Sequence, residues 1–365
     1  MAWASSLIHP ESVCKRKVND VLIPAPRLKT IATLLLKAAR VPLADAEMVA
    51  DSLVEANLRG VDSHGVQHLP IYVERIRLGL VELHPTFPIL NEANSTALID
   101  GQNSLGQVAA MHAMELAIAK GREAGTALIG VRGTNHCGML AYFAMRAVRE
   151  GLIGFASCNG PANMAPWGGK DLLISNNPIC FAIPAGEDLP IVLDMANSVV
   201  AKGKLYAARS KGESIPEGWA LDKHGQPTTD PSAALNGGSL VPVGRYKGYG
   251  LALVMDVMAG LMTGSGFGLG VGSLHHELTR GMNLGLLMGA MNVESFMPLS
   301  TFRQLVDDYS QQMRSSTPAA GFERVYLPGE LEFAGRLRRT EEGIPVPQKV
   351  WQALLTTAQE LGVDL

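Results

Sequence analysis

Residues 126–158 read TALIGVRGTNHCGMLAYFAMRAVREGLIGFASC, and the order of local patterns within them indicates the fold class. The apolar run from Thr126 to Val131 is typical of a strand and leads into the polar turn RGTNHCG. The segment Met139 to Glu150 has apolar residues at helical spacing, and Leu152 to Cys158 is again strand-like. A strand, a helix and a further strand in succession predict an α/β fold.

The same alternation continues on both sides of this stretch. Further helices are predicted at 27–40, 42–60, 69–78, 106–121, 196–211, 247–263, 301–313 and 347–361. Further strands are predicted at 95–100, 172–184, 191–195 and 284–293. Residues 212–240 are rich in Gly, Pro, Asp and Ser and predict an excursion of turns.

Composition limits the class of protein. The chain has 365 residues, of which 47% are hydrophobic and 18% charged, as in ordinary globular proteins. The formal charge is −3, so no basic excess is available to neutralise a nucleic-acid backbone, and we expect no nucleic-acid partner. The uncharged stretch 257–274 contains six glycines, which favours a helix end followed by a loop over a membrane span.

The cysteines and the first residues point to a compartment. Cys14, Cys137, Cys158 and Cys180 have no CxxC spacing, which argues against a disulfide framework or a closed zinc site and fits a reducing cytosol. No apolar signal-peptide core is evident near the beginning of the sequence. We therefore expect a cytoplasmic protein with no membrane anchor and no metal site.

The common catalytic and nucleotide-binding motifs are absent. No GxGxxG lies between a strand and a helix, and GxxxxGK[ST], HExxH and GxSxG do not occur. The site must therefore be sought among single residues at the ends of predicted elements.

Two histidines are candidates for acid–base chemistry. His64 lies in the sequence DSHG, just after a helix that ends at Gly60, and a helix C-terminus favours the protonated form of a nearby imidazole. The alternative for DSHG is a capping turn, and the local pattern alone favours that alternative. His136 follows an apolar strand in RGTNHCG, at the edge where α/β sheets bind ligands, although a plain polar turn is an equal alternative.

Three further residues are candidates for holding a cofactor. Asp194 ends the strand IVLDM, where a carboxylate can fix a hydroxyl, and the predicted helix after it offers free N–H groups to an anion. Lys202 in that helix and Lys247 in GRYKGYG are placed to contact phosphate. A plain helix cap and exposed surface lysines are the alternatives.

Together these motifs resemble the type-2 malate/L-lactate dehydrogenase family, which includes ureidoglycolate and sulfolactate dehydrogenases, 2,3-diketogulonate reductase and piperideine-2-carboxylate reductase. The resemblance covers residues 23–362 and rests on DSHG, NHCG, PWGGKDLLISNNPICFAIP, VLDMANS, IPEGWALDKHGQPTTDP and KGYGLAL in this order. It implies a non-Rossmann nicotinamide-binding fold and a homodimer. It also implies that residues 1–22 are an extension, 23–95 a helical segment contributing to the substrate site, 96–320 the α/β cofactor-binding domain, and 321–365 a segment packing with the helical part.

The resemblance also implies site residues. The acid/base histidine of the family corresponds to His64 or His136, since members differ in which of the two transfers the proton. Substrate contacts are expected from Ser63, His68, Asn135 and Arg75. Cofactor contacts are expected from Gly160, Asn177, Asp194, Met195, Ala196, Asn197, Ser198, Lys202, Lys247, Gly248, Gly329 and Glu330.

One position departs from the family pattern. Many members carry an arginine four residues after the DSHG histidine, where it can grip a substrate carboxylate, but this chain has His68 there. Either Arg75 replaces that arginine or the substrate differs. Lys202 is placed to pair with a 2′-phosphate, which favours NADP over NAD as the cofactor.

The resemblance implies hydride transfer between NAD(P)H and C2 of a small 2-oxo or 2-hydroxy acid, with a histidine of near-neutral pKa moving the proton. One alternative is an NADPH-dependent reductase of a cyclic imino acid such as piperideine-2-carboxylate. The other is a nucleotide-binding homologue without activity.

Overall fold

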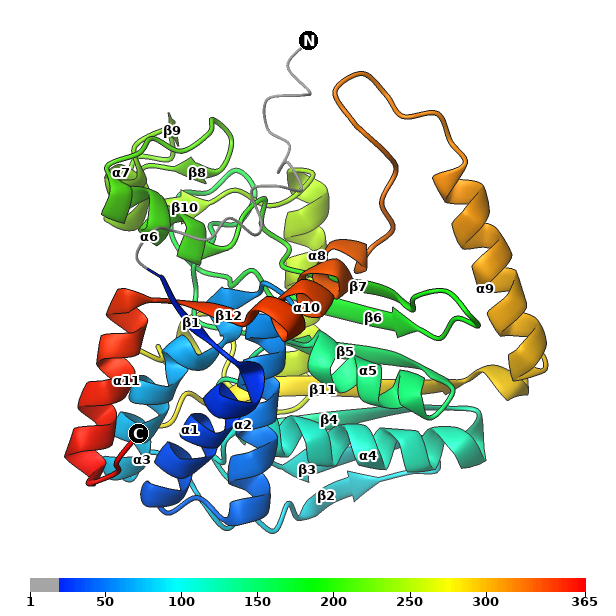
Figure 1. Cartoon of the computed structure of the whole chain (residues 1–365), viewed down its shortest axis with the longest axis horizontal. Coiled ribbons are helices and arrows are strands. Elements are labelled where there is room, and N and C mark those ends of the chain that lie inside the picture. Colours follow the sequence, from blue (N-terminus) through cyan, green and yellow to red (C-terminus); the bar gives the residue numbers. More distant parts are fainter. Residues whose placement is uncertain (1–19) are drawn as a thin grey trace.

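The computed structural model describes residues 20–365 as a central sheet covered by helices, with a helical unit at one end (Figure 1). Nearly all of the predicted N-terminal extension, and Cys14 with it, lies outside the described residues. The mixed α/β fold agrees with the predicted class.

The sheet has seven strands in the order β2-β3-β4-β11-β5-β6-β7. Their bounds are β2 Ile89–Glu92, β3 Thr96–Asp100, β4 Thr126–Thr134, β5 Leu152–Cys158, β6 Ile179–Ile183, β7 Ile191–Met195 and β11 Leu284–Asn292. Strands β4 and β5 run in the same direction, as a strand–helix–strand unit requires, but β11 lies antiparallel between them. Only β3 and β4 are parallel neighbours, so the sheet differs from a doubly wound one.

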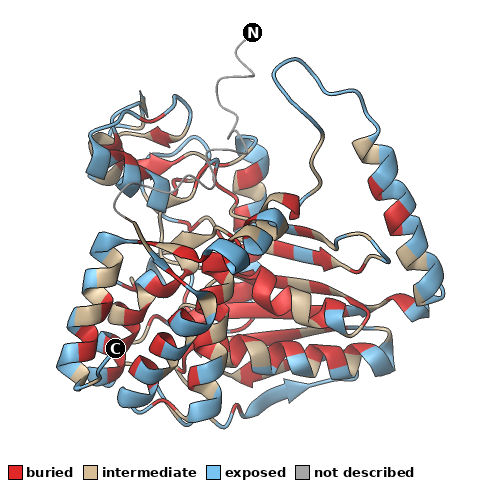
Figure 2. Cartoon of the chain, in the orientation of Figure 1, coloured by how far each residue is buried: buried red, intermediate tan, exposed pale blue. Residues whose placement is uncertain are grey.

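Helices α4 (Gly106–Ala124) and α5 (Ala141–Arg149) pack on one face of the sheet and share a buried core with its strands. Figure 2 colours the buried residues of these helices and strands red. Small residues allow this close approach. A Cβ atom at Gly154 of β5 would lie 2.1 Å from the Ala144 carbonyl oxygen of α5. The residues of this core are mostly alanines on the helices and branched aliphatic or methionine side chains on the strands.

A second core joins the two ends of the described chain. Helices α1 (Ala25–Ala38), α2 (Leu43–Leu58) and α3 (Leu69–Arg77) form a unit with the C-terminal helix α11 (Gln348–Leu361). Helix α11 contacts α1 and α3, and strand β1 (Asp20–Ile23) pairs antiparallel with β12 (Ile344–Pro347). Helix α10 (Glu330–Glu342) lies against α2.

A third, smaller core lies within residues 164–252. It contains α6 (Lys202–Lys211), α7 (Pro231–Leu235), the short strands β8 (Ala220–Leu221), β9 (Pro227–Thr228) and β10 (Ser239–Leu240), and the start of α8 (Tyr246–Asp256). Helix α8 continues as a π-helix, Val257–Leu261, and a glycine-containing loop follows, as predicted. Within residues 20–365 no helix is both long and apolar enough to cross a bilayer.

Several predicted bounds were wrong. The helix predicted at 196–211 begins only at Lys202, because Ser198 forms a β-bridge with Pro242. The strand predicted at 172–184 is limited to β6, and β1, β2, β12 and α10 were not predicted. Helix α9 (Leu299–Arg314) matches its prediction and lies at the edge of the molecule in Figure 1.

Candidate active site

His64 is held in place by the junction between α2 and α3. It ends the 3-10 turn Asp62–His64. The Asp62 carboxylate accepts two hydrogen bonds from Arg339 of α10, at 2.7 and 3.0 Å. The Asn57 side chain at the end of α2 accepts from the Val66 backbone, 2.9 Å away. Neither the 3-10 turn nor the helical turns that follow it have a side-chain cap, so the capping turn, which the sequence left as the alternative, is not formed by DSHG.

His136 follows the end of β4, beside the first turn of α4. A Cβ atom at Gly106 would lie 2.1 Å from the Asn135 carbonyl oxygen, so only glycine lets the helix begin this close to His136. The Asn135 amide donates to the Asn103 and Ser104 carbonyls, at 2.8 and 3.0 Å. Asn135 is 4% exposed, and these hydrogen bonds hold the turn that carries His136.

The fold brings four histidine rings together, and we call His64, His68, His136 and His275 the histidine cluster. Ring centroids are 5.8 Å apart for His64 and His136, 5.0 Å for His68 and His136, and 5.7 Å for His68 and His275. Within the part of the chain that the structure describes, no group of His, Cys, Asp or Glu side chains is arranged to hold a metal ion. Imidazole rings donate, accept and carry protons, so the cluster can take part in acid–base chemistry.

Tyr72 of α3 fixes one ring of the cluster. Its hydroxyl lies 2.6 Å from Nδ1 of His136 and accepts from the Gln107 side-chain amide of α4, 3.0 Å away. Tyr72 is 3% exposed and Gln107 is fully buried. Because Nδ1 of His136 is engaged in this way, Nε2 is the nitrogen left to meet a substrate.

Burial keeps the histidine cluster neutral. It lowers the pKa of His64 to about 4 and, together with His64 and His275, that of His68 to about 4. Burial and the three other histidines hold the pKa of His136 well below its ordinary value of 6.5. The expectations that a helix C-terminus favours protonated His64 and that the histidine pKa is near neutrality were wrong, because loss of hydration outweighs the helix C-terminus.

A cavity of about 470 Å³ opens beside His64. It lies between the helical unit, the turn after β4, the end of β7 and the segment that precedes α10. Its lining includes Arg59, Ser63, His64, Gly138, Ala141, Asp194, Ala196, Tyr326, Pro328 and Gly329. The same cavity is thus lined by His64 and by four other predicted site residues, Ser63, Asp194, Ala196 and Gly329.

Asp194 is exposed to this cavity and anchored by α5. One carboxylate oxygen accepts from the Ala141 backbone N–H at the start of α5, 2.8 Å away. The protein packed around the carboxyl raises its pKa to about 6, an effect that the Ala141 hydrogen bond and Arg59 partly offset. Gly329 closes the opposite side with φ +93°, and a Cβ there would lie 3.0 Å from that of Val192.

Several predicted cofactor residues hold backbone segments in place and do not line the cavity. Asn177 is fully buried and donates to the Ala252 carbonyl, and Asn197, also buried, donates to the Asn177 carbonyl. Gly248 approaches Val243 so closely that a Cβ would lie 2.1 Å from its carbonyl oxygen. The Ser198 hydroxyl donates to the Val200 carbonyl. These residues shape the backbone, and none of them lines the cavity.

The remaining predicted residues are more widely spread. Met195 ends β7, and Gly160 lies against the Ser175 hydroxyl, 2.7 Å from where its Cβ would be. Lys247 at the start of α8 is exposed. Lys202 begins α6, and the neighbouring Gly203 would place a Cβ 3.6 Å from that of Ser63. The start of α6 therefore lies beside the cavity.

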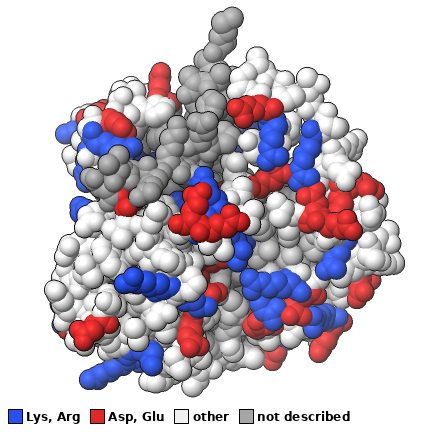
Figure 3. All heavy atoms as spheres, viewed as in Figure 1, with Lys and Arg blue, Asp and Glu red and all other residues white. Residues whose placement is uncertain are grey.

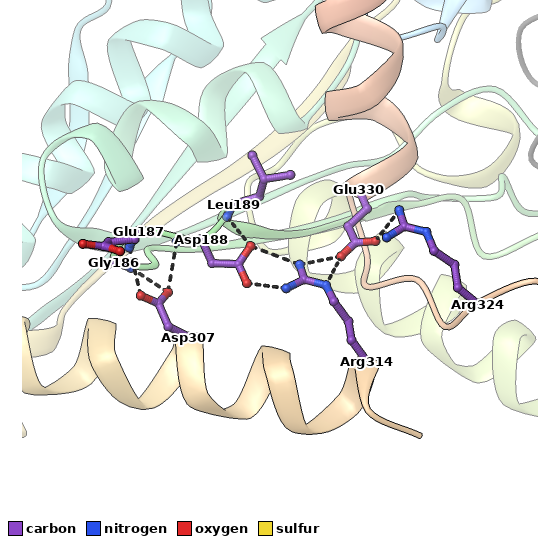
Figure 4. Close-up of polar contacts among 8 residues, drawn as sticks. All are labelled: Gly186, Glu187, Asp188, Leu189, Asp307, Arg314, Arg324 and Glu330. Atoms are coloured by element: carbon purple, nitrogen blue, oxygen red, sulfur yellow. Dashed lines mark hydrogen bonds and ion pairs between the residues drawn. The ribbon is translucent and has the colours of Figure 1, made fainter. Parts of the chain in front are cut away.

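Two predicted contacts are corrected by the structure. Arg75 is 1% exposed, and its guanidinium donates to the carbonyls of Glu277 and Arg280, at 2.8 and 2.9 Å, so it is not free to grip a substrate carboxylate. The Glu330 carboxylate lies between Arg314 and Arg324 and does not line the cavity (Figure 4). It ties α10 to the end of α9.

Sequence reasoning missed four residues of the site. Tyr72 and Gln107 lie on helices. The only feature of the sequence that could have marked them as site residues was a polar group within an apolar helix face. His275 is adjacent to His276 in the sequence, a spacing that suits neither a helical nor a strand metal face, and no other signal marks it. Arg59, which lines the cavity, donates to Glu55 and lies over the Phe333 ring, 4.6 Å from its centroid.

The chain matches proteins of known activity over nearly its whole length. Residues 23–355 match the family model described as malate/L-lactate dehydrogenase. Malate dehydrogenase from Pyrococcus horikoshii is 39% identical over 95% of this chain and 97% of its own. NAD⁺-dependent ureidoglycolate dehydrogenase from Escherichia coli O157:H7 is 37% identical, covering 86% of this chain and 89% of its own. NADP⁺-dependent (2R)-3-sulfolactate dehydrogenase from Chromohalobacter salexigens is 36% identical, covering 90% and 96%.

Solved structures agree with the sequence comparison. The structure of malate dehydrogenase from Pyrococcus horikoshii OT3 superposes with a TM-score of 0.89 at 36% identity, covering 96% of this chain and 98% of that one. Δ1-Piperideine-2-carboxylate reductase from Pseudomonas syringae gives a TM-score of 0.82 at 26% identity, covering 93% and 100%. The chain therefore belongs to the malate/L-lactate dehydrogenase family, as its motifs predict, and is a dehydrogenase of that non-Rossmann fold.

Proposed function

We propose that this protein is an NAD(P)-dependent oxidoreductase that interconverts a small 2-hydroxy acid and its 2-oxo acid. The observation that supports this most strongly is that neutral His64 lines a cavity of about 470 Å³ and stacks with His136, whose ring centroid lies 5.8 Å from its own. The related dehydrogenases bear names that specify malate, ureidoglycolate or sulfolactate, all of them small 2-hydroxy acids.

The residues of the cavity fit a nicotinamide dinucleotide. Asp194 offers a carboxylate to a ribose hydroxyl, Ala196 and Gly329 offer backbone groups, and the N-terminus of α6 with Lys202 offers N–H donors to phosphate. The cofactor, when bound, accepts or supplies the hydride. The two related dehydrogenases named for NAD⁺ and NADP⁺ show that the family uses both, and Lys202 favours NADP here.

His136 and His64 handle the proton. In the oxidation direction, Nε2 of neutral His136 accepts the proton of the substrate hydroxyl, while the Tyr72 oxygen accepts from Nδ1–H and stabilises the imidazolium. In reduction the same imidazolium returns the proton to the developing alkoxide. His64, with Ser63 Oγ 3.1 Å from its Nδ1, lies beside His136 from the cavity side and is the second acid–base candidate.

A substrate panel tests this function. The full chain is assayed with NADH and NADPH against pyruvate, oxaloacetate, 3-sulfopyruvate, 2-oxosuccinamate and piperideine-2-carboxylate. Reduction of at least one 2-oxo acid supports the proposal. Reduction of the cyclic imine alone would replace it with the imine reductase. Binding of a nucleotide in a fluorescence titration, without reduction of any substrate, would favour the nucleotide-binding homologue without activity.

The quaternary structure and location belong to the same proposal. Helix α8 and its π-helical continuation leave a row of apolar side chains exposed, with Leu251 at 45%, Val254 at 50% and Met262 at 56%. A second copy of this chain is the natural cover for such a row, so we propose a homodimer. Sedimentation velocity should report a dimer for the native chain and a monomer for Val254→Arg. The free thiols of Cys137, Cys158 and Cys180 support a cytoplasmic location.

A further inference from the structure

His68 is held in a single tautomer by the backbone. Its Nε2 lies 2.7 Å from the Ser63 carbonyl oxygen, which can only accept a hydrogen bond. Nε2 must therefore carry the proton. Burial lowers the pKa of His68 to about 4, so the ring is neutral at pH 7 and its other nitrogen, Nδ1, presents a lone pair.

That lone pair has no partner among the described residues. Nδ1 of His68 is buried and makes no hydrogen bond, although its ring lies 5.0 Å from that of His136, edge to face. A buried acceptor without a donor is destabilising and calls for a physical explanation. A substrate group held at His136, to which the proposed function assigns the proton transfer, would supply the missing donor.

Positive charge is scarce in this part of the site. In the described residues, the groups that shift the pKa values of His68 and His136 through their charge are other histidines, and none is a lysine or an arginine. Arg75 is the nearby permanent cation and its charge acts on His275, but two backbone carbonyls accept hydrogen bonds from its guanidinium. A second carboxylate on the substrate would meet the lone pair of His68 here, which cannot donate a hydrogen bond to it.

From these contacts we propose that His68 determines substrate specificity by accepting a hydrogen bond from the substrate. The protein then prefers 2-oxo and 2-hydroxy acids whose C3 carries a neutral O–H or N–H donor. Acids whose C3 carries a second anion are poorer substrates. The proposal rests on the function proposed above and names the substrate class within it. His68 contacts substrate in this scheme and transfers no proton.

Two substrates of nearly the same shape provide the test. Oxaloacetate carries a carboxylate on C3, and 2-oxosuccinamate carries a carboxamide of equal size. With the unaltered full chain and NADPH, kcat/KM for the amide should exceed that for the carboxylate by more than about tenfold, because a site built around a hydrogen bond rejects a substrate that cannot form it. Equal values, or a preference for oxaloacetate, would overturn the proposal.

A pair of variants assigns the preference to His68. His68→Arg places a cation at this position and should shift the ratio toward oxaloacetate by at least about tenfold. The control Gln67→Arg adds the same charge at an exposed neighbour and should leave the ratio within about twofold. An unchanged ratio in a folded His68→Arg protein would show that another group selects the substrate.

The experiment separates the two proposals. If no 2-oxo acid is reduced with either nucleotide, the proposed function fails and the specificity proposal fails with it. If both acids are reduced and oxaloacetate is preferred, the function stands and only the role of His68 is wrong. The comparison with the unaltered chain remains decisive even if His68→Arg does not fold.

Discussion

The imidazole rings of His64 and His136 lie nearly parallel, with centroids 5.8 Å apart and planes inclined by 18°. One ring comes from the junction of α2 and α3 and the other from the end of β4, so the contact joins the helical unit to the sheet. Two imidazoles this close disfavour simultaneous protonation, because each positive charge lowers the pKa of the other ring. The pair therefore holds at most one proton through most of the pH range.

Replacing either ring should lower turnover while leaving the fold intact. We expect His136→Asn and His64→Asn each to reduce kcat/KM by about 10²–10⁴-fold, the usual contribution of a positioned acid or base. Steady-state kinetics and circular dichroism of the full chain check this. His276→Asn, an exposed histidine outside the histidine cluster, is the control and should keep nearly full activity. Near-native activity of both cluster variants would show that neither histidine transfers the proton.

The two reaction directions should depend on pH with opposite slopes. Oxidation needs a neutral imidazole, and the pKa of His64 is about 4, so kcat/KM for oxidation should stay level well below pH 6.5. Reduction needs the imidazolium, whose population falls tenfold per pH unit above that pKa. Its kcat/KM should therefore fall as pH rises from 5 to 8. Initial rates in both directions over this range measure the slopes.

Acid unfolding must be separated from this profile. The folded-state pKa values of His64 and His68 lie below their unfolded value of 6.5, so the unfolded chain binds protons more readily. Their stabilisation is present above pH 6.5 and is lost as the pH falls toward 4. Thermal midpoints recorded at each pH identify this loss. An inflection near pH 6.5 in a fully folded sample would contradict the low pKa of the catalytic pair.

Lys202 should determine the choice of nucleotide. If it pairs with a 2′-phosphate, Lys202→Ala should raise KM for NADPH by about 10–100-fold, the value of a charge-assisted hydrogen bond, and leave KM for NADH within about twofold. Lys204 lies in the same helix but over the Trp219 ring, 5.9 Å from its centroid, so Lys204→Ala is a matched control. If Lys202→Ala raises KM equally for NADPH and NADH, the lysine contacts a part of the nucleotide that both cofactors share.

The ion-pair network of Arg314 should stabilise the wall of the cavity. Arg314 contacts both Asp188, in the β6–β7 connection, and Glu330, next to Gly329 (Figure 4). Arg314→Ala leaves the buried Glu330 with only the more exposed Arg324. We expect a loss of about 1–3 kcal/mol in the free energy of unfolding and a higher KM for the nucleotide. Denaturant titration and kinetics measure both.

An exposed ion pair provides the comparison. Arg122 at the end of α4 pairs with Glu150 on the surface, so Arg122→Ala should cost roughly 0–1 kcal/mol and leave KM unchanged. Figure 3 shows such acidic and basic side chains interspersed on one face of the molecule. If both variants lose the same stability, the Arg314 network has no special role.

Sequence patterns located the elements with strong periodicity and missed those that depend on partners. Helices α1, α2, α4 and α9 and strand β4 were predicted because their apolar residues repeat at the spacing of the element. Strand β12 contains two prolines and becomes a strand only by pairing with β1, and α10 is so charged that it shows little apolar face. Long-range pairing of this kind leaves no local signal.

The site was predicted in outline but not in its electrostatics. The motifs led to His64, His136 and Asp194 because polar residues at element ends are unusual in apolar surroundings. They did not reveal Tyr72 beside His136, nor that Arg75 is occupied by the 274–280 loop, because both facts depend on contacts between distant segments. They also could not predict the low pKa values, since burial is a property of the assembled fold.

The pairing of β1 with β12 has a consequence for the order of folding during synthesis. Strand β1 cannot pair until residues 344–347 have been made, and α11 then completes the packing of α1 and α3. The loop carrying His64 likewise gains its contact with Arg339 only after α10 has been made. All seven strands of the sheet precede α10 in the chain, so the sheet can form before the contacts that place His64.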